Sequence, residues 1–108
     1  MNQHVQLADV LLQLECELRR LHLWQDLPPS AQALASELPF AVDTLEFHQW
    51  LQFVLLPKLQ HLILVEAQLP SACNISAYAE EVYQTSAPIP LALMAVIKRL
   101  DDTLNRRF

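Results

Sequence analysis

The sequence has 108 residues and contains no glycine. Phosphate-binding loops, dinucleotide-binding turns and the nucleophile elbow of hydrolases need glycine, because the backbone must turn sharply or approach the ligand closely. Tight hairpins of the type I′ class depend on it as well. The absence excludes these loops and disfavours sheet folds, whereas a helical bundle can turn with proline, serine and asparagine.

Basic residues are also scarce, with 7 Lys and Arg against 12 Asp and Glu and a formal net charge of −5. Binding to nucleic acid or to anionic membranes uses clustered positive charge. We therefore expect no autonomous nucleic-acid binding and no membrane binding. The first twenty residues lack the features of a signal peptide, and no run approaches the roughly 20 apolar residues that span a bilayer. A cytoplasmic location is expected.

The residues that usually carry chemistry are few and scattered. Cys16 and Cys73 stand far apart, and no carboxylate precedes His22, His48 or His61 at the spacing of a helical metal site. No serine lies in a catalytic motif. The sequence therefore predicts no catalytic residue, no metal site and no cofactor, and it leaves open a site that assembles from distant positions.

Three further groups have a simple structural interpretation. Adjacent acids such as Glu80–Glu81 and Asp101–Asp102 point in different directions on a helix, so we predict that they are solvated. Cys16 falls off the apolar seam of its helix and is interpreted as a small apolar residue.

Leucine-rich helical spacing is what the chain has in abundance, with 53 % hydrophobic residues. Residues 1–108 are predicted to form one domain. The expected segments are a helix over Gln3–Leu23, a short helix over Ala31–Leu38 capped by Ser30, a central stretch over Pro39–Leu69, a helix of about ten residues capped by Asn74 or Ser76, and a last helix over Leu91–Arg106. These segments predict an all-α fold, a compact bundle of four main helices, mostly antiparallel, with a short extra helix.

Apolar seams predict the core of the first and last helices. The first seam is Leu7, Leu11, Leu14, Leu18 and Leu21, and the last is Leu93, Val96, Ile97, Leu100 and Leu104. Steps of three and four place each set on one face of a helix.

The central stretch is predicted to begin at Asp43, with Asp43 as the N-cap and Glu46 closing a capping box. Its main apolar face starts at Phe47, and the same phase continues through Leu62 and Val65. Pro57 interrupts the rod because it lacks an N–H and crowds the preceding turn, so we expect a kinked or split central helix.

Two surfaces on the central stretch are candidates for function. The first is an apolar interaction patch made of Trp24, Leu45, Phe53, Leu56 and Ile63. The second is a groove lined by His48, Gln49, Trp50 and Gln52. For the three polar residues of this groove, plain solvent exposure on a surface strip is the competing interpretation.

The motifs Pro39-Phe40, Asp43-Thr44, Phe47, Trp50-Leu51-Gln52 and Pro57 resemble those of the YqcC-like family of small bacterial proteins. The likeness covers nearly the whole chain. The resemblance implies a compact all-α cytoplasmic domain of uncharacterised function, with no catalytic residues to carry over. Genes of this family often lie next to one for a tRNA pseudouridine synthase, which implies a link to tRNA modification.

Residues and resemblance together favour a non-enzymatic helical protein–protein interaction module. It would self-associate or serve as an accessory to a tRNA pseudouridine synthase that supplies the basic surface. The alternative is a helical bundle that binds a small apolar ligand near Trp50. An enzyme without a recognisable motif is the third hypothesis.

Overall fold

The computed structural model describes residues 2–71, 73–86 and 90–105, and within them it contains helices and no strand. The elements are α1 (Gln3–Arg20), α2 (Ala31–Leu34), a 3₁₀ turn η1 (Pro39–Ala41), α3 (Phe47–Trp50), a π-helical turn η2 (Leu51–Leu55), α4 (Leu56–Leu64), α5 (Ile75–Ser86) and α6 (Leu91–Asn105). The predicted all-α fold is confirmed. Arg106, the predicted end of the last helix, lies outside the described residues.

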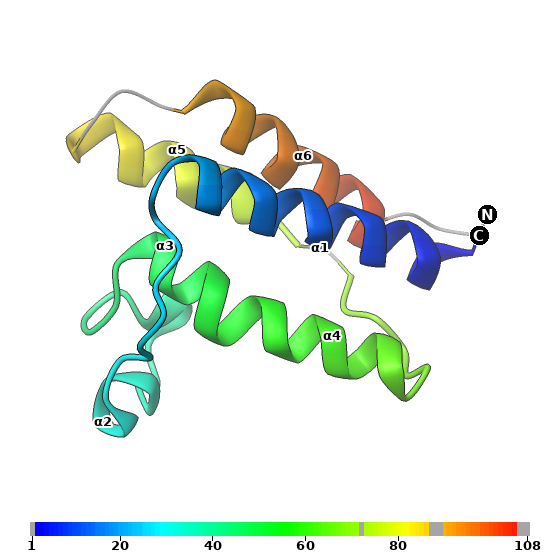
Figure 1. Ribbon diagram of the computed structural model, residues 1–108, viewed down its shortest axis with the longest axis horizontal. Helices are drawn as coiled ribbons and strands as arrows, with labels where there is room; N and C mark the ends of the chain where they lie inside the picture. The colour runs from blue at the N-terminus through cyan, green and yellow to red at the C-terminus, as the bar shows by residue number, and fades with distance from the viewer. Residues whose placement is uncertain (1, 72, 87–89, 106–108) are drawn as a thin grey trace.

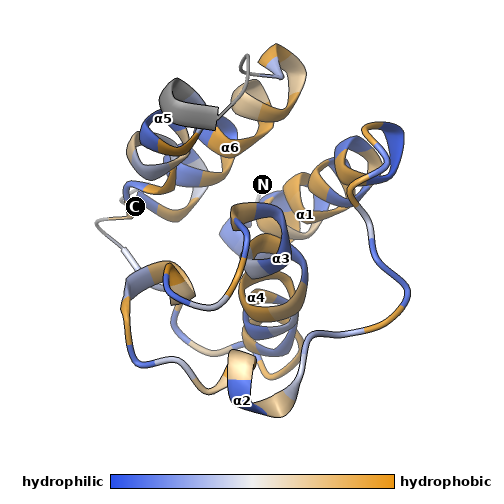
Figure 2. Cartoon of the chain, turned by 90° about the vertical axis from the view of Figure 1, so that its left-hand side faces the viewer, coloured by the Kyte–Doolittle hydropathy of each residue, from blue (hydrophilic) through white to orange (hydrophobic). Residues whose placement is uncertain are grey.

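Three bodies pack around one core. Figure 1 shows α1 between the α5–α6 hairpin on one side and the rod made of α3, η2 and α4 on the other. Seen nearly end-on, α1, the hairpin and the rod stand at the corners of a triangle (Figure 2). Helix α1 runs antiparallel to both α6 and α4, which confirms the predicted antiparallel arrangement. Helix α2 and its flanking loops lie beside the α3 end of the rod.

The seams of α1 and α6 form the centre of this core. The buried seam residues are Leu7, Leu11, Leu14 and Leu18 in α1 and Leu93, Val96, Ile97, Leu100 and Leu104 in α6. Full burial of a leucine side chain contributes about 1.5–3 kcal/mol, so these seams contribute a large part of the stability of the fold. The predicted seams are confirmed, with Leu21 only partly buried at the end of α1.

The rod begins three residues later than predicted. The N-cap is Glu46, whose N–H donates to Oε1 of Gln49 at 2.8 Å. The predicted cap, Asp43, instead accepts from Oγ of Ser36 at 2.5 Å. The N–H of Leu45 donates to the Ala41 carbonyl at 2.9 Å within the preceding turn. Glu46 has an extended backbone, with φ −68° and ψ 156°, so the helix begins only after it.

The helix does not break at Pro57; it changes its hydrogen bonding just before it. The N–H of Leu56 donates to the carbonyl of Leu51, five residues back, and Leu56 keeps helical angles of φ −57° and ψ −51°. A π-helical turn of this kind absorbs the crowding that a proline causes inside a regular helix. The rod is therefore continuous rather than split.

The extra residue of the π turn rotates α4, and the predicted apolar face is wrong in part beyond it, although Leu62 packs against the core and Leu69 is buried. Leu56 and Leu59 are buried, whereas Val65, expected on the core side, is 53 % exposed. A regular helical period assigned through Pro57 is out of phase by one residue from there on.

Side chains close the α5–α6 hairpin. Asp101, predicted to be solvated, is buried and accepts the N–H groups of Ile75 at 2.9 Å and Ser76 at 2.8 Å. A carboxylate at this position binds the first N–H groups of α5 and complements its dipole. Helix α5 begins at Ile75, directly after Asn74, one of the two predicted caps. Asp102, the neighbour of Asp101, is exposed as expected.

Two helices are followed by a residue in the left-handed backbone conformation, a position where glycine is usual. His22 follows α1 with φ 60° and Glu66 follows α4 with φ 54°. After α4 the N–H of Ala67 donates to the Leu62 carbonyl at 2.9 Å, and Leu23 makes the same bond to Leu18 at 2.8 Å. This is the Schellman arrangement, in which a side chain with a Cβ carries a steric cost.

We predict that Glu66→Gly stabilises the protein by about 1 kcal/mol, because glycine removes the clash of the left-handed conformation. Urea unfolding measures the change. Gln60→Gly, at an exposed regular position of α4, is the matched control and should cost about 1 kcal/mol. Equal destabilisation by both substitutions would contradict the assigned geometry.

Candidate interaction surface

The predicted apolar patch does not form a continuous exposed surface. Leu45 and Leu56 are buried, at 8 % and 2 % exposed, so neither is available to a partner. Trp24, Phe53 and Ile63 are half-buried. The reason for the burial of Leu56 is the rotation of the rod at η2, which turns this side chain inward.

The ring of Trp24 is also covered by the side chain of Arg19. The guanidinium of Arg19 lies over its ring at 4.6 Å from the centroid, and the same side chain donates from Nε to Oε2 of Glu15 at 3.0 Å. Trp24 also packs against the core. Its role in this structure is to close the end of α1 over the bundle.

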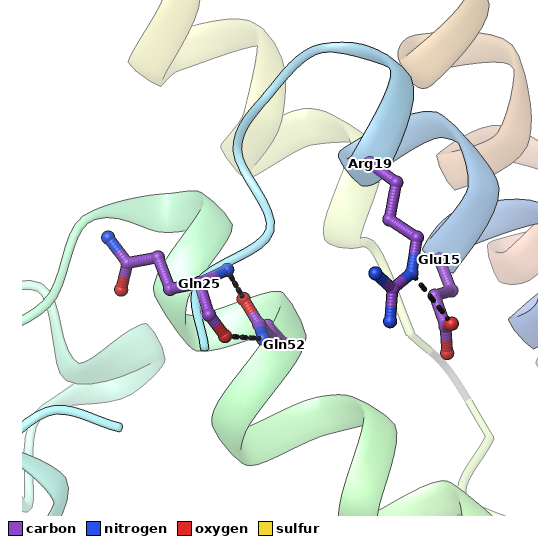
Figure 3. A network of polar contacts seen from close by, with 4 residues as sticks. All are labelled: Glu15, Arg19, Gln25 and Gln52. Atoms are coloured by element: carbon purple, nitrogen blue, oxygen red, sulfur yellow. Dashed lines mark hydrogen bonds and ion pairs between the residues drawn. The ribbon is translucent and has the colours of Figure 1, made fainter. Parts of the chain in front are cut away.

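The predicted polar groove is replaced by a clamp on the loop that follows α1. Gln52 is buried; its Oε1 accepts from the N–H of Gln25 at 2.9 Å, and its Nε2 donates to the carbonyl of Gln25 at 2.7 Å (Figure 3). Gln49 adds a bond from Nε2 to Oε1 of Gln25 at 3.2 Å. One amide side chain thus pairs with both backbone groups of a residue 27 positions away.

We predict that Gln52→Ala destabilises the protein by about 2–3 kcal/mol, because it removes both bonds and opens a space in the core. Gln60→Ala, on the exposed side of the same rod, should change stability by less than about 0.5 kcal/mol. Thermal or urea unfolding compares the two. A Gln52→Ala protein as stable as the wild type would show that the clamp is dispensable.

His48 lies half-buried beside this clamp. Burial lowers its pKa, and the nearby charge of Glu46 and the backbone of Leu23 oppose the shift. Its Nδ1 is buried without a hydrogen-bond partner among the described residues. The side chain is therefore held as the neutral imidazole rather than as a cation in a polar groove.

A lowered pKa at His48 makes stability depend on pH. His48 binds a proton near pH 6.5 in the unfolded chain and only at lower pH in the folded chain. The stability that neutral His48 contributes is therefore fully present above its unfolded pKa, and it is lost as the pH falls through its folded pKa. We predict that the stability difference between wild type and His48→Gln shrinks between pH 7.5 and pH 5. A constant or widening difference would contradict the lowered pKa.

Trp50 lines a recess on another side of the rod. The recess encloses about 230 Å³ between the rod, the chain before α3 and the start of α5, with Phe40, Leu59, Cys73 and Ile75 among its walls. The ring of Phe40 stacks on Tyr78 at 4.1 Å between centroids. Burial raises the pKa of the Cys73 thiol, with the charge of Asp101 as a second cause, so this sulfur is held in its protonated form.

A second hollow, which the sequence did not indicate, runs between α1 and α4. Two adjoining spaces of about 260 and 430 Å³ share Ala8 and Ile63 in their walls. Leu12 lines one and Val5 the other, and both are more than half exposed. We call this the α1–α4 groove. Val5 and Leu12 lie off the α1 seam, as does Cys16, which is exposed and lines a different hollow.

Within residues 2–71, 73–86 and 90–105 no three His, Cys, Asp or Glu side chains gather as metal ligands would. No helix in that part of the chain is both long and apolar enough to cross a bilayer.

The fold and sequence match those of known proteins. Residues 6–103 match the DUF446 family, whose description is tRNA pseudouridine synthase C. The uncharacterized protein YqcC of Escherichia coli K12 is 32 % identical over 101 residues, which span 94 % of this chain and 93 % of that protein. This chain belongs to the YqcC-like family. The solution NMR structure of the Escherichia coli YqcC protein covers 96 % of this chain and 89 % of its own, with a TM-score of 0.84 and 31 % identity.

Two other relatives match a shorter part of the chain. An uncharacterized protein of Haemophilus influenzae is 44 % identical over 71 residues, which span 66 % of this chain and 67 % of that protein. The tRNA pseudouridine synthase C of Pectobacterium carotovorum is 37 % identical over 70 residues, 65 % of this chain. The matched segment makes up only 19 % of that protein. In Pectobacterium a YqcC-like segment is thus part of a much longer chain.

Proposed function

We propose that this chain is a non-enzymatic protein-interaction module that acts as an accessory to a tRNA pseudouridine synthase. The observation that carries the proposal is the YqcC-like segment within the longer Pectobacterium protein that is named tRNA pseudouridine synthase C. Linking two units in one chain keeps them at a high effective concentration, in the millimolar range for a short flexible linker. Where the two units are separate chains, a binding surface between them has to replace the link.

The charge of the chain supports a role beside the enzyme rather than on the RNA. A net charge of −5 repels the phosphate backbone of tRNA, and tRNA binding needs clustered Lys and Arg. A synthase that binds tRNA provides such a surface itself. An acidic module is attracted to basic side chains of such an enzyme and does not itself bind RNA phosphates.

The buried polar side chains also favour a module without chemistry of its own. Gln52 holds Gln25, Asp101 caps α5, and Oγ1 of Thr103 donates to the Arg99 carbonyl at 2.8 Å. Each of these groups satisfies a backbone atom within the fold. They therefore serve the packing of the helices rather than a reacting centre.

The alternative function, binding of a small apolar ligand, is favoured by the recess beside Trp50 and Phe40. Its volume of about 230 Å³ suits a ligand smaller than a typical drug. Three of the four predicted groove residues, His48, Gln49 and Gln52, are absent from its walls.

The test uses the purified chain, the full-length tRNA pseudouridine synthase C of the source organism and its tRNA. We expect the chain to form a complex of fixed stoichiometry with the synthase in light scattering. We expect no retardation of tRNA by the chain alone and no pseudouridine formed by it. The rate of pseudouridine formation by the synthase, measured with and without the chain, reports whether the complex is functional.

Pseudouridine formation by the chain alone, or its direct binding to tRNA, would contradict the proposal. Failure to bind the synthase would do so as well. If the chain does not bind the synthase, and its Trp50 fluorescence changes as a small apolar probe is titrated, the result would favour the alternative function of binding a small apolar ligand. Trp50→Phe separates that signal from the signal of Trp24.

A further inference from the structure

We infer that the α1–α4 groove is where the synthase docks, through an apolar helical segment that carries Lys or Arg at its ends. The inference rests on the proposed function and adds to it the surface and the chemistry of the partner's segment. It follows from the shape of the groove, from the charges at its two ends and from the bonds that hold it open.

The shape fits a helix laid lengthwise. Since α1 and α4 run antiparallel, the wall from Val5 to Leu12 faces the wall from Gln60 to Glu66 in reverse order. The α1 wall from Val5 to Glu15 is about 15 Å long, at 1.5 Å rise per residue. This length accommodates nearly three turns of a partner helix, with apolar residues spaced at three and four.

Leu12 is the exposed ridge of the groove. It is 65 % exposed and also borders a shallow hollow between α1 and α6 that Val96 lines. A leucine that stands between two hollows loses the most water on contact with a partner. Such a residue is a candidate anchor of the interface.

The charges at the groove select a basic partner. Glu15 lines the groove at one end and Glu66 at the other, and none of the lining residues is Lys or Arg. Arg19 pairs with Glu15 from outside the groove at 3.0 Å, whereas Glu66 is exposed. A segment of a tRNA-binding enzyme with Lys or Arg near its ends complements this pattern.

The same charges disfavour a second copy of this chain as the occupant. In a two-fold dimer the same surface meets itself. Glutamates at both ends of the groove would then face glutamates whichever way the copies are placed. Like charges opposed in an interface are destabilising.

Hydrogen bonds at the wider end make the groove preformed. Nε2 of His4 lies 2.7 Å from the carbonyl of Ala67, and Nε2 of Gln3 donates to the carbonyl of Thr103 at 2.9 Å. The first turn of α1 is thereby tied to the ends of both α4 and α6. A rigid site loses little conformational freedom on binding, which favours affinity.

Two pairs of variants of the full chain test the inference by calorimetric titration into the full-length synthase. Leu12→Glu should weaken binding about tenfold or more, because it puts charge on the apolar ridge. Leu27→Glu, the same change at an 82 % exposed loop position away from the groove, should leave affinity within about twofold. Circular dichroism confirms that each variant is folded.

Glu66→Lys should weaken binding about threefold at low salt and reduce the salt dependence of the affinity. Asp26→Lys makes the same charge change in the exposed loop after α1 and should have the smaller effect. Because Glu66 is exposed, this pair reports on the groove even if a substitution at Leu12 disturbs the helix.

The outcomes separate the inference from the proposed function. A wild-type chain that binds the synthase, with each groove variant matching its control, overturns the groove and leaves the accessory role intact. A wild-type chain that does not bind overturns both. A chain that instead forms a dimer disrupted by Leu12→Glu assigns the groove to a second copy and also overturns the inference.

Discussion

The turn before Pro57 determines how the rod meets the rest of the molecule. A proline cannot donate the next helical hydrogen bond, and its ring crowds the preceding turn. The chain accommodates it with a π turn in which Leu56 bonds back to Leu51. The extra residue rotates α4, so that Leu56 and Leu59 join the core while Ile63 lies at the side facing α1. The filling of the core and the wall of the α1–α4 groove both follow from this local change in backbone geometry.

Polar side chains then fix the segments that the helices leave irregular. The amide of Gln52 holds the loop after α1, and the carboxylate of Asp101 caps α5. Asn105 pairs with both backbone groups of Cys73, through bonds of 2.7 Å each. Leucine burial supplies the driving force for compaction, whereas these bonds determine how the connections lie. With the interior closed in this way, an outer face of α1 and the adjoining side of α4 remain exposed.

The candidate surfaces were harder to predict than the core. In the predicted patch, Leu45, Leu56 and Ile63 were grouped by a regular helical period, and that period ends at η2. Trp24 and Phe53 were added to them as apolar side chains expected to be exposed. Gln52 was assigned to a surface strip because glutamine is usually exposed; its partner, Gln25, lies 27 residues away. The α1–α4 groove is lined by residues of two helices, so it could not be predicted before the relative position of these helices was known. Its residues on α1 were visible only as apolar positions off the main seam.

The sequence by itself determined the all-α class, the seams of α1 and α6, and membership of the YqcC-like family. These features depend on local periodicity and on motifs that neighbouring residues carry. Tertiary structure decided the phase of α4, the burial of Gln52 and Asp101, and the position of the groove. Each of these results from contacts between segments far apart in the chain, or from a backbone change that costs little locally and is selected by the packing around it.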